Sequence, residues 1–262
     1  MTEIRHTIDG FVAELVLDGP AQRNAVDESA LRSLAAAVDE IAAAVGANAV
    51  RAVILRGEGK VFCAGRDISA VDPRTDDALG FLNGEVAPAI RAIRSLAVPT
   101  FASVQGAALG VGFGLAAACD VIYAGESAKF GSPFGAIGAV PDSGAHAFFV
   151  DRLGYHRAMD LIYTGELISG TQAAEYGLVS RAIPDAELLD AVRSTAVKVA
   201  TGPTRAFAAS KALAQLYFDQ RQPLHDVMTA EAEAQEAARQ TKDYLEGFAA
   251  FQQKRAPQFE GR

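Results

Sequence analysis

Three stretches of the chain hold residue types suited to catalysis. They cover residues 61–68, 106–114 and 130–144, and each combines glycines with apolar residues. In the second stretch the glycines fall where an apolar strand is expected to turn into a helix, so the backbone can approach a ligand closely. The first N–H groups of such a helix have no internal partner and favour negative charge. We therefore expect an anion, or charge that develops during a reaction, at this turn.

Two other interpretations of the glycine-rich turn stay open. The anion could be a dinucleotide pyrophosphate, although the spacing is G-x-G-x-G rather than G-x-G-x-x-G and the stretch lies in mid-chain. Alternatively, the glycines only permit tight helix packing.

The third stretch contains one acid, Asp142, between a proline and a serine. An apolar pocket would raise its pKa towards neutrality and suit it to act as a base. The expected walls of that pocket are Phe134, Ile137, Val140 and Phe148. Capping of the following helix is the alternative role of Asp142, and cap amides would instead lower its pKa. His146 lies one helical turn further on, within reach of Asp142, and is expected to line the pocket or face solvent.

The elements around these stretches alternate in a way that is typical of an α/β layered core. Asp9-Gly10 between two alternating runs predicts a hairpin, and Asp27 is a suitable cap for the helix that follows. We expect strands over 51–57, 98–104 and 121–124, and helices over 27–45, 76–95, 187–200, 203–217 and 223–250. We divide the chain into a core, 1–200, and a C-terminal helical region, 201–262.

Composition limits the function further. The 262 residues carry a net charge of −8, which argues against nucleic-acid binding. The longest apolar run, 107–119, is too short and too rich in glycine to span a bilayer, and the N-terminus has no signal-peptide pattern. Cys63 and Cys119 are expected to be buried, reduced thiols. These features favour a cytoplasmic protein without a membrane partner.

Taken together, the motifs resemble the enoyl-CoA hydratase/isomerase (crotonase) superfamily over essentially the whole chain. The matching segments are 22–25, 62–68, 105–110, 119–120, 130–131, 153–154, 164–165, 173–179, 246–248 and 254–257. The resemblance implies a spiral of ββα units and a C-terminal helical region that builds a homotrimer, often doubled into a hexamer. It also implies an acyl-CoA thioester as substrate, with coenzyme A as part of that substrate and no metal or other cofactor.

The resemblance assigns roles to individual residues. The backbone amides of Arg66 and Val111 would hold the thioester oxygen as the catalytic oxyanion hole. Further substrate contacts fall by position on Arg23, Ala25, Ala64, Asp67, Ile68, Gly110, Phe134, Ile137, His146 and Lys254. Arg23 and Lys254 are the cations placed to meet phosphates, the latter across a subunit boundary. Structural roles in turns are the alternative for Asp67, as for Asp120.

The chain departs from the hydratase pattern at both catalytic acids. Hydratases of this superfamily use two glutamates, and the matching residues here are Gly114 and Phe134. Asp142 instead matches the acid of isomerase relatives. We therefore predict an acyl-CoA isomerase in which Asp142 moves a proton from C2 to C4. The alternatives are a hydratase-like or hydrolytic enzyme and a catalytically silent acyl-CoA-binding protein. The sequence does not determine the acyl group, the pathway or the choice between trimer and hexamer.

Overall fold

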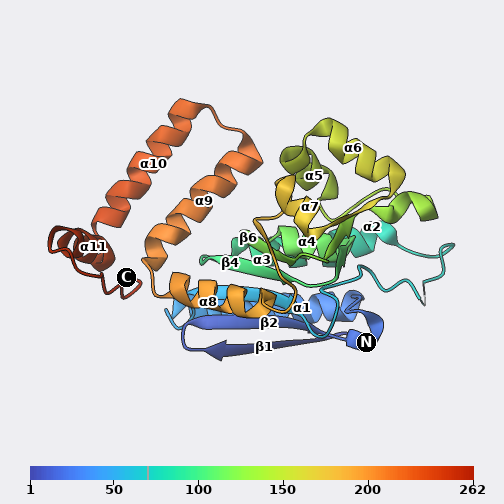
Figure 1. Ribbon diagram of the computed structural model, residues 1–262, viewed down its shortest axis with the longest axis horizontal. Helices are drawn as coiled ribbons and strands as arrows, with labels where there is room; N and C mark the ends of the chain where they lie inside the picture. Colours follow the sequence, from blue (N-terminus) through green and yellow to red (C-terminus); the bar gives the residue numbers. More distant parts are fainter. Residues whose placement is uncertain (70) are drawn as a thin grey trace.

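The computed structural model describes residues 1–69 and 71–262. A layered α/β core occupies most of the chain, and three C-terminal helices extend from it as an arm (Figure 1). The larger sheet has the strand order β1-β2-β3-β4-β6-β9. Its strands are β1 (Glu3–Asp9), β2 (Val12–Asp18), β3 (Ala52–Gly57), β4 (Thr100–Val104), β6 (Val121–Gly125) and β9 (Arg181–Ile183).

Only the first pair of this sheet is antiparallel, and the other four pairs are parallel. The predicted hairpin is confirmed: Asp9 pairs with Val12, and Gly10 takes the positive φ of 55° that the tight turn needs. Parallel strands are covered on both faces, which explains why the β3 segment reads as continuously apolar.

Helices cover the two faces of the larger sheet. On one face, Val53 and Leu55 pack in the same core cluster as the buried residues of α1 (Glu28–Gly46) and α3 (Ala87–Ser95). On the other face, Ala52 and Ile54 pack with α8 (Leu188–Ala200). Asp27 caps α1 by accepting a hydrogen bond of 2.8 Å from the backbone of Ala30, as predicted.

A small second sheet supplies the other strand of each ββα unit. Its strands are β5 (Ala107–Leu109), β7 (Lys129–Gly131) and β8 (Leu167–Ser169), in that order. The chain thus passes from β4 to β5 and into α4 (Val111–Ala117), then from β6 to β7 and into α5 (Ala145–Leu153). A 3-10 turn, η3 (Pro133–Ile137), precedes α5, and α6 (Tyr155–Thr164) and α7 (Gly170–Glu175) flank β8.

The predicted helix over 76–95 is interrupted rather than continuous. It comprises α2 (Ala78–Phe81), a π-helical turn η2 (Leu82–Val86) and then α3. Pro88 lies at the start of α3 and has no N–H for the hydrogen-bond ladder of the preceding turn. The helical register is therefore reset at this point.

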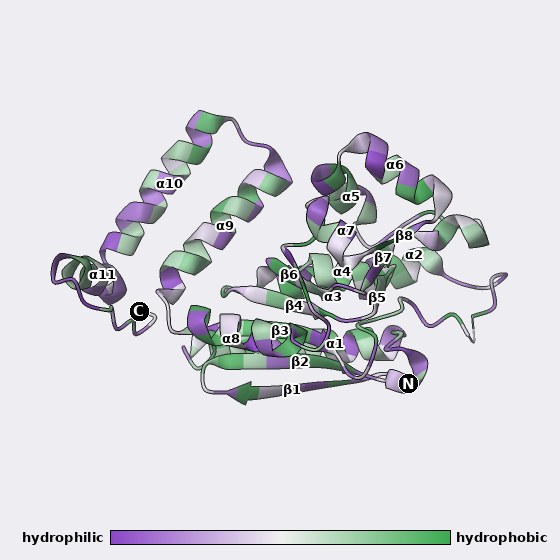
Figure 2. Cartoon of the chain, in the orientation of Figure 1, coloured by the Kyte–Doolittle hydropathy of each residue, from purple (hydrophilic) through white to green (hydrophobic). Residues whose placement is uncertain are grey.

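The C-terminal arm consists of α9 (Thr204–Gln220), α10 (Leu224–Arg239) and α11 (Lys242–Gln252). The predicted segment 223–250 is thus two helices. Figure 2 shows mixed hydropathy along α10, and none of its residues is buried within the chain. At the base of the arm, Lys211 Nζ lies 2.9 Å from Asp120 Oδ2. The division at residues 200 and 201 stays a prediction.

Both cysteines are buried free thiols, as predicted, and burial raises the pKa of each to about 12. No helix in residues 1–69 and 71–262 has both the length and the apolar character needed to cross a bilayer. The cytoplasmic location stays a prediction.

Candidate active site

The predicted motif 22–25, which follows β2, runs beside the motif 62–68, which follows β3. The amide of Ala64 donates to the carbonyl of Arg23 at 3.0 Å, and the amide of Val26 donates to the carbonyl of Gly65 at 2.9 Å. The amide of Asp67 then donates to Val26 at 2.8 Å. The segment that contains Ala25 is thereby fixed against the segment 64–67.

The glycine-rich stretch joins them from the other side. The amide of Cys63 donates to the carbonyl of Ala107 at 3.0 Å, and Leu109 donates back to Cys63 at 3.2 Å. Helix α4 begins directly after this short ladder, and Gly112 packs on Cys63 so closely that an added methyl group would lie 2.7 Å from Cys63 Cβ. A larger residue at position 112 would push the helix away from the motif.

Two backbone amides remain free at this junction. Val26 forms both hydrogen bonds of its parallel bridge with Arg66, so the N–H of Arg66 is directed away from Val26. Val111 is the first residue of α4, and its N–H has no partner inside the helix. Neither amide has an acceptor anywhere in residues 1–69 and 71–262.

The two free amides lie close together because Gly65 is in contact with the turn before α4. Gly65 has a φ of 108°, and a methyl group there would lie 3.0 Å from Leu109 O and 3.9 Å from Val111 N. Arg66 follows Gly65 directly. Two unpaired backbone donors near each other are the groups from which an oxyanion hole is built.

Asp142 is half-buried between Pro141 and Ser143, and Ser143 lies against Gly114 of α4. The hydroxyl of Ser143 donates to Asp142 Oδ1 at 2.8 Å. Desolvation is the largest effect and raises the pKa of Asp142, while the Ser143 hydrogen bond and the charge of Arg66 act in the opposite direction. Burial therefore moves the pKa of Asp142 upward, towards the neutral range that suits a general base.

The capping role considered for Asp142 is wrong. The N-cap residue of α5 is Gly144, and no side chain accepts a hydrogen bond from that helix terminus. Asp142 contributes only its backbone carbonyl, which accepts a hydrogen bond of 2.9 Å from Ala145. Its carboxylate therefore escapes the cap amides that would have lowered its pKa.

The two positions that hold glutamate in hydratases are occupied differently here. A methyl group on Gly114 would lie 2.6 Å from both the Cβ and the carbonyl oxygen of Ser143, so no side chain fits. Ser143 itself has a φ of 57°. Phe134 is half-buried, and its Cζ would lie 3.3 Å from a methyl group on Gly110. One glutamate position is therefore occupied by the apolar ring of Phe134. At the other, Gly114, the Cβ and carbonyl oxygen of Ser143 fill the space that a side chain would need.

The side chain of Arg66 binds an acid and an aromatic ring. Its Nη1 and Nη2 lie 2.9 and 2.6 Å from the two carboxylate oxygens of Asp76, and its guanidinium stacks over Phe81 at 4.0 Å. Neither partner was predicted from the sequence. They come from an irregular segment and a short helix, and no periodic pattern links either of them to position 66.

Other predicted contacts lie around the junction. Asp67 accepts hydrogen bonds of 3.0 and 2.6 Å from the backbone and hydroxyl of Ser69, and the hydroxyl bond lowers its pKa. These bonds fit the structural role considered for Asp67. Ile68 and Ile137 are 56% and 68% exposed, and His146 is also exposed. His146 forms no hydrogen bond with Asp142.

The two predicted phosphate contacts do not meet in one chain. Arg23 is exposed after the 3-10 turn η1 (Pro20–Gln22), in the connection between β2 and α1. Lys254 is exposed just beyond α11, which lies at the opposite end of the molecule (Figure 1). Asp120, in contrast, has the structural role that was considered for it, because it accepts hydrogen bonds from the amide and hydroxyl of Thr100.

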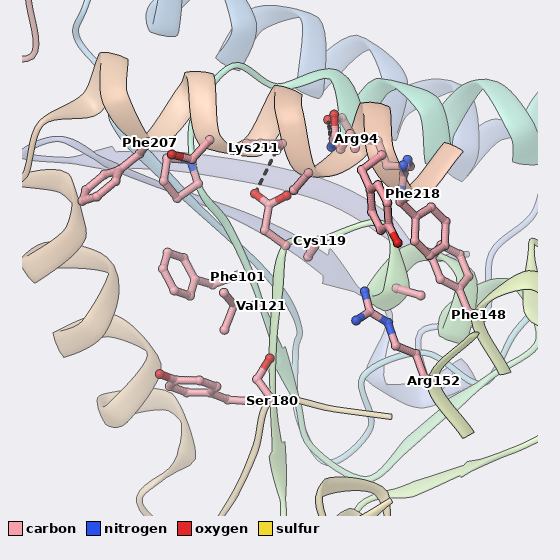
Figure 3. A pocket seen from close by; sticks show the side chains of 18 of the residues that line it. Arg94, Phe101, Cys119, Val121, Phe148, Arg152, Ser180, Phe207, Lys211 and Phe218 are labelled. Atoms are coloured by element: carbon pink, nitrogen blue, oxygen red, sulfur yellow. Dashed lines mark hydrogen bonds and ion pairs between the residues drawn. The ribbon is translucent and has the colours of Figure 1, made fainter. Parts of the chain in front are cut away.

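A separate cavity of about 1000 Å³ lies between α9 and the first residues of β4 and β6 (Figure 3). Phe148 belongs to its lining and stacks on Phe218 at 6.0 Å. Asp142, Arg66 and Val111 are not among the lining residues in the described part of the chain. Of the other expected walls, Val140 is 73% exposed.

No group of three or more His, Cys, Asp or Glu side chains within residues 1–69 and 71–262 could hold a metal ion. The expectation that the reaction needs no metal or other cofactor stays a prediction.

Comparison with known proteins gives a consistent result. The model of the enoyl-CoA hydratase/isomerase family matches residues 7–262. A probable enoyl-CoA hydratase of Rhodobacter capsulatus is 35% identical, with 99% of this chain and 98% of that protein covered. The 1,2-epoxyphenylacetyl-CoA isomerase of Escherichia coli is 31% identical, with 97% of each chain covered.

Solved structures agree with the sequence matches. The crystal structure of an enoyl-CoA hydratase/isomerase from Mycobacterium abscessus superimposes with a TM-score of 0.90 at 33% identity, and covers 99% of this chain and 100% of that chain. The ββα spiral implied by the resemblance is thereby confirmed as the fold.

Proposed function

The chain belongs to the enoyl-CoA hydratase/isomerase family, and from that premise we propose that it is an acyl-CoA isomerase. Membership makes it an enzyme of the crotonase superfamily that acts on acyl-CoA. The specific reaction proposed is the shift of a double bond through a thioester enolate. The observation that carries it is the half-buried carboxylate of Asp142, whose neighbour Ser143 leaves no room for a glutamate at Gly114 of α4.

The free amides of Arg66 and Val111 are the proposed oxyanion hole. When a proton leaves C2, negative charge moves onto the thioester oxygen, and two prealigned N–H donors stabilise that charge more than they stabilise the neutral carbonyl. Each donor is worth about 3 kcal/mol of transition-state stabilisation. Because both are backbone groups, the Val111 side chain does not interfere with the donor.

Asp142 is the proposed base. Its carboxylate takes one proton from C2 of a 3-enoyl thioester, and the C–H electrons enter a dienolate that spans C1 to C4. The protonated carboxyl then returns the proton to C4, which leaves the double bond between C2 and C3. Protons and electrons balance without an oxidant or a water molecule. A raised pKa brings Asp142 closer to the neutral range in which such transfer is efficient.

The hydratase pattern fits this site less well. Addition of water needs one group to activate the water and another to protonate the α-carbon, and Phe134 and Gly114 supply neither. The names of the relatives include both hydratases and an isomerase. Identification of the product therefore distinguishes isomerisation from hydration.

Purified wild-type protein and Asp142→Asn should be compared with a 3-enoyl-CoA, with formation of the conjugated 2-enoyl thioester as the readout. We expect turnover to fall by about 10²- to 10⁴-fold, because the amide keeps the shape but cannot accept the proton. Asp72→Asn is the matched control, since the Asp72 carboxylate only accepts a backbone hydrogen bond from Arg74 at 3.0 Å.

Wild-type turnover in Asp142→Asn would remove Asp142 from this role. Faster hydration of crotonyl-CoA than isomerisation of the 3-enoyl thioester would replace the proposed reaction with that of a hydratase. Failure of both reactions despite binding of coenzyme A thioesters would instead identify a silent binding protein.

We also propose that the chain assembles as a homotrimer or hexamer through the C-terminal arm. Side chains on α11 support this, because Leu245, Phe248 and Phe251 are 64%, 52% and 85% exposed in the single chain. Exposed apolar side chains clustered on one element commonly mark an association surface.

A further inference from the structure

The end of the chain folds back along α11 instead of extending away from it. After α11 ends at Gln252, Lys254 takes a positive φ of 54°, and the segment 255–262 returns towards the start of the helix. Glu246 of α11 accepts a hydrogen bond of 2.8 Å from the amide of Gln258 on the way. We call residues 255–262 the tail. Because of this return, the C-terminus lies beside the core (Figure 1).

Asp243, at the start of α11, binds the far end of the tail with both oxygens of its carboxylate. Oδ1 accepts a hydrogen bond of 2.7 Å from the amide of Glu260, and Oδ2 accepts one of 2.8 Å from the amide of Gly261. Asp243 is only 3% exposed. A buried carboxylate is costly unless hydrogen bonds satisfy it, and hydrogen bonds to a charged group are the strong ones. The tail amides supply these bonds, so α11 and the tail form one unit.

The core binds the opposite side of the tail. Arg51, which lies just before β3, donates from its guanidinium to the carbonyls of Phe259 and Glu260. Asn48 Nδ2 donates to the same Glu260 carbonyl at 3.0 Å. The Arg51 guanidinium also lies over the ring of Phe11 at 4.0 Å, and the residue is only 6% exposed. The core therefore offers the tail donors that are already held in place.

The contact between tail and core has room only for glycine at position 261. Gly261 is buried and has a φ of 79°. A methyl group there would lie 2.8 Å from Asn48 Oδ1 and 3.0 Å from Arg51 Nε. Both the backbone conformation and the close approach thus require a residue without a side chain.

The polar bonds between α11 and the core run through the tail. Within residues 1–69 and 71–262, no hydrogen bond or ion pair joins α11 directly to the core residues 1–200. The connection passes instead from Asp243 to the tail, and from the tail to Arg51 and Asn48. Helix α10, which precedes α11, has no buried residue. The placement of α11 therefore depends on the tail.

We propose that the tail fixes α11 to the core of its own chain and thereby presents the apolar side chains of α11 for assembly. This role rests on the proposed assembly through the C-terminal arm. Asp243 and Glu246 share one face of α11 by their helical spacing, and the tail covers that face. Leu245 and Phe248 lie on the opposite face and are 64% and 52% exposed. A bound tail thus leaves the apolar face free for another copy of the chain.

Hydrogen exchange and native mass, both measured on the full-length protein, test the proposal. In Gly261→Ala and in Asp243→Asn we expect the Glu260 amide to exchange about tenfold faster or more, because its bond to a charged group is lost or weakened. The mass should shift from that of the assembly towards that of one chain. Amides of β3 should keep their wild-type protection, which shows that the core is still folded.

Each variant has a matched control. Gly46→Ala adds the same methyl group at the end of α1, where nothing lies within 4 Å of it. Asp39→Asn removes the same charge from an exposed position of α1. Neither control should change the exchange of the tail or the mass. Leu245→Asp alters the apolar face alone, so it should lower the mass without accelerating exchange of the Glu260 amide.

The outcomes separate the role of the tail from the assembly itself. If Gly261→Ala frees the Glu260 amide while the mass stays that of the wild-type assembly, the arm assembles without the tail, and the positioning role is refuted. Exchange of the Glu260 amide in the wild type at the rate of an unfolded peptide would show that the tail is not bound. A monomeric wild type refutes the assembly, and the role of the tail in it fails as well.

Discussion

At the scale of single residues, a carboxylate that removes a proton from carbon must be ionised and poorly solvated at once. Asp142 meets both demands because burial raises its pKa while the Ser143 hydroxyl stabilises the charged form. Ser143 also fills the space beside Gly114, and it does so with a φ of 57° that a non-glycine residue rarely adopts. Ser143 thus acts on the pKa of the proposed base and also fills the space at the position where hydratases are expected to carry one of their acids.

Replacement of Ser143 by alanine tests this tuning. The hydroxyl bond lowers the pKa of Asp142, so its loss should raise that pKa. Because the base must be ionised, the acid limb of the rate profile should move to higher pH, while the rate on the alkaline plateau changes little. Ser143→Gly also removes the hydroxyl, suits the positive φ, and should move the acid limb in the same direction. A profile that moves to lower pH in Ser143→Ala would contradict the assigned effect of the hydroxyl.

The sequence predicts the candidate residues only where a motif lies within a few neighbouring positions. Arg66 and Val111 were assigned by position from the resemblance, and the role of their amides as an oxyanion hole stays a prediction. The Asp76 and Phe81 contacts of Arg66 escaped prediction because they depend on how an irregular segment folds back over ten or more positions. The capping role considered for Asp142 was wrong because α5 begins at Ala145, two residues later than a cap at Asp142 would require.

At the scale of elements, α8 is fixed to the larger sheet by an ionic network as well as by its apolar face. Glu14 on β2 accepts hydrogen bonds from Arg56 on β3 at 3.0 Å and from Arg193 on α8 at 2.9 Å. The Arg193 bond is the main reason that the pKa of Glu14 is lowered. Only 15% of the Glu14 side chain is exposed. The network therefore links three elements that are distant in sequence.

Glu14→Gln should lower the free energy of unfolding at neutral pH by about 1 kcal/mol. A lowered pKa means that ionised Glu14 stabilises the fold above the ordinary glutamate range, and this contribution is lost as the pH falls through the folded-state pKa. The stability difference between wild type and variant should therefore shrink in acid. Urea unfolding at several pH values measures it. A difference that grows as the pH falls would refute the assignment.

Element boundaries were predictable where a local signal exists and not elsewhere. The hairpin at Gly10 and the cap at Asp27 follow from residues within a few positions of the boundary. The π-helical turn η2 within the expected helix 76–95 was missed, because apolar periodicity does not distinguish a π turn from an α turn. Phe81 precedes this turn directly, so the irregularity lies next to the residue that supports Arg66.

At the scale of the whole molecule, the C-terminal arm has too little apolar contact with its own core to explain its composition. None of the residues of α10 is buried in the single chain, and α11 exposes large apolar side chains. The tail returns to the core through Asn48, whose side chain donates to Glu260 O at 3.0 Å. Helix α9 is thus bonded to the core through Lys211 and Gln215 and the tail through Asn48, while α10 and the apolar side chains of α11 remain exposed between them.

We expect this open surface to be covered by other copies of the chain. Light scattering on the purified protein should give three or six times the 27.4 kDa of one chain. Phe251→Asp places a charge on the most exposed aromatic residue of α11 and should shift the mass towards the monomer. A monomeric wild type at micromolar concentration would refute the assembly.

Incorporation of deuterium at C2 of a 3-enoyl-CoA in deuterated water tests the central claim most directly, because it detects the enolate whatever the final product. Mass spectrometry should find deuterium at C2 with the wild-type protein at a rate far above that in buffer. The rate with Asp142→Asn should be lower by about 10²- to 10⁴-fold. Absence of deuterium with the wild type, or equal rates in the two proteins, would contradict enolate formation with Asp142 as the base.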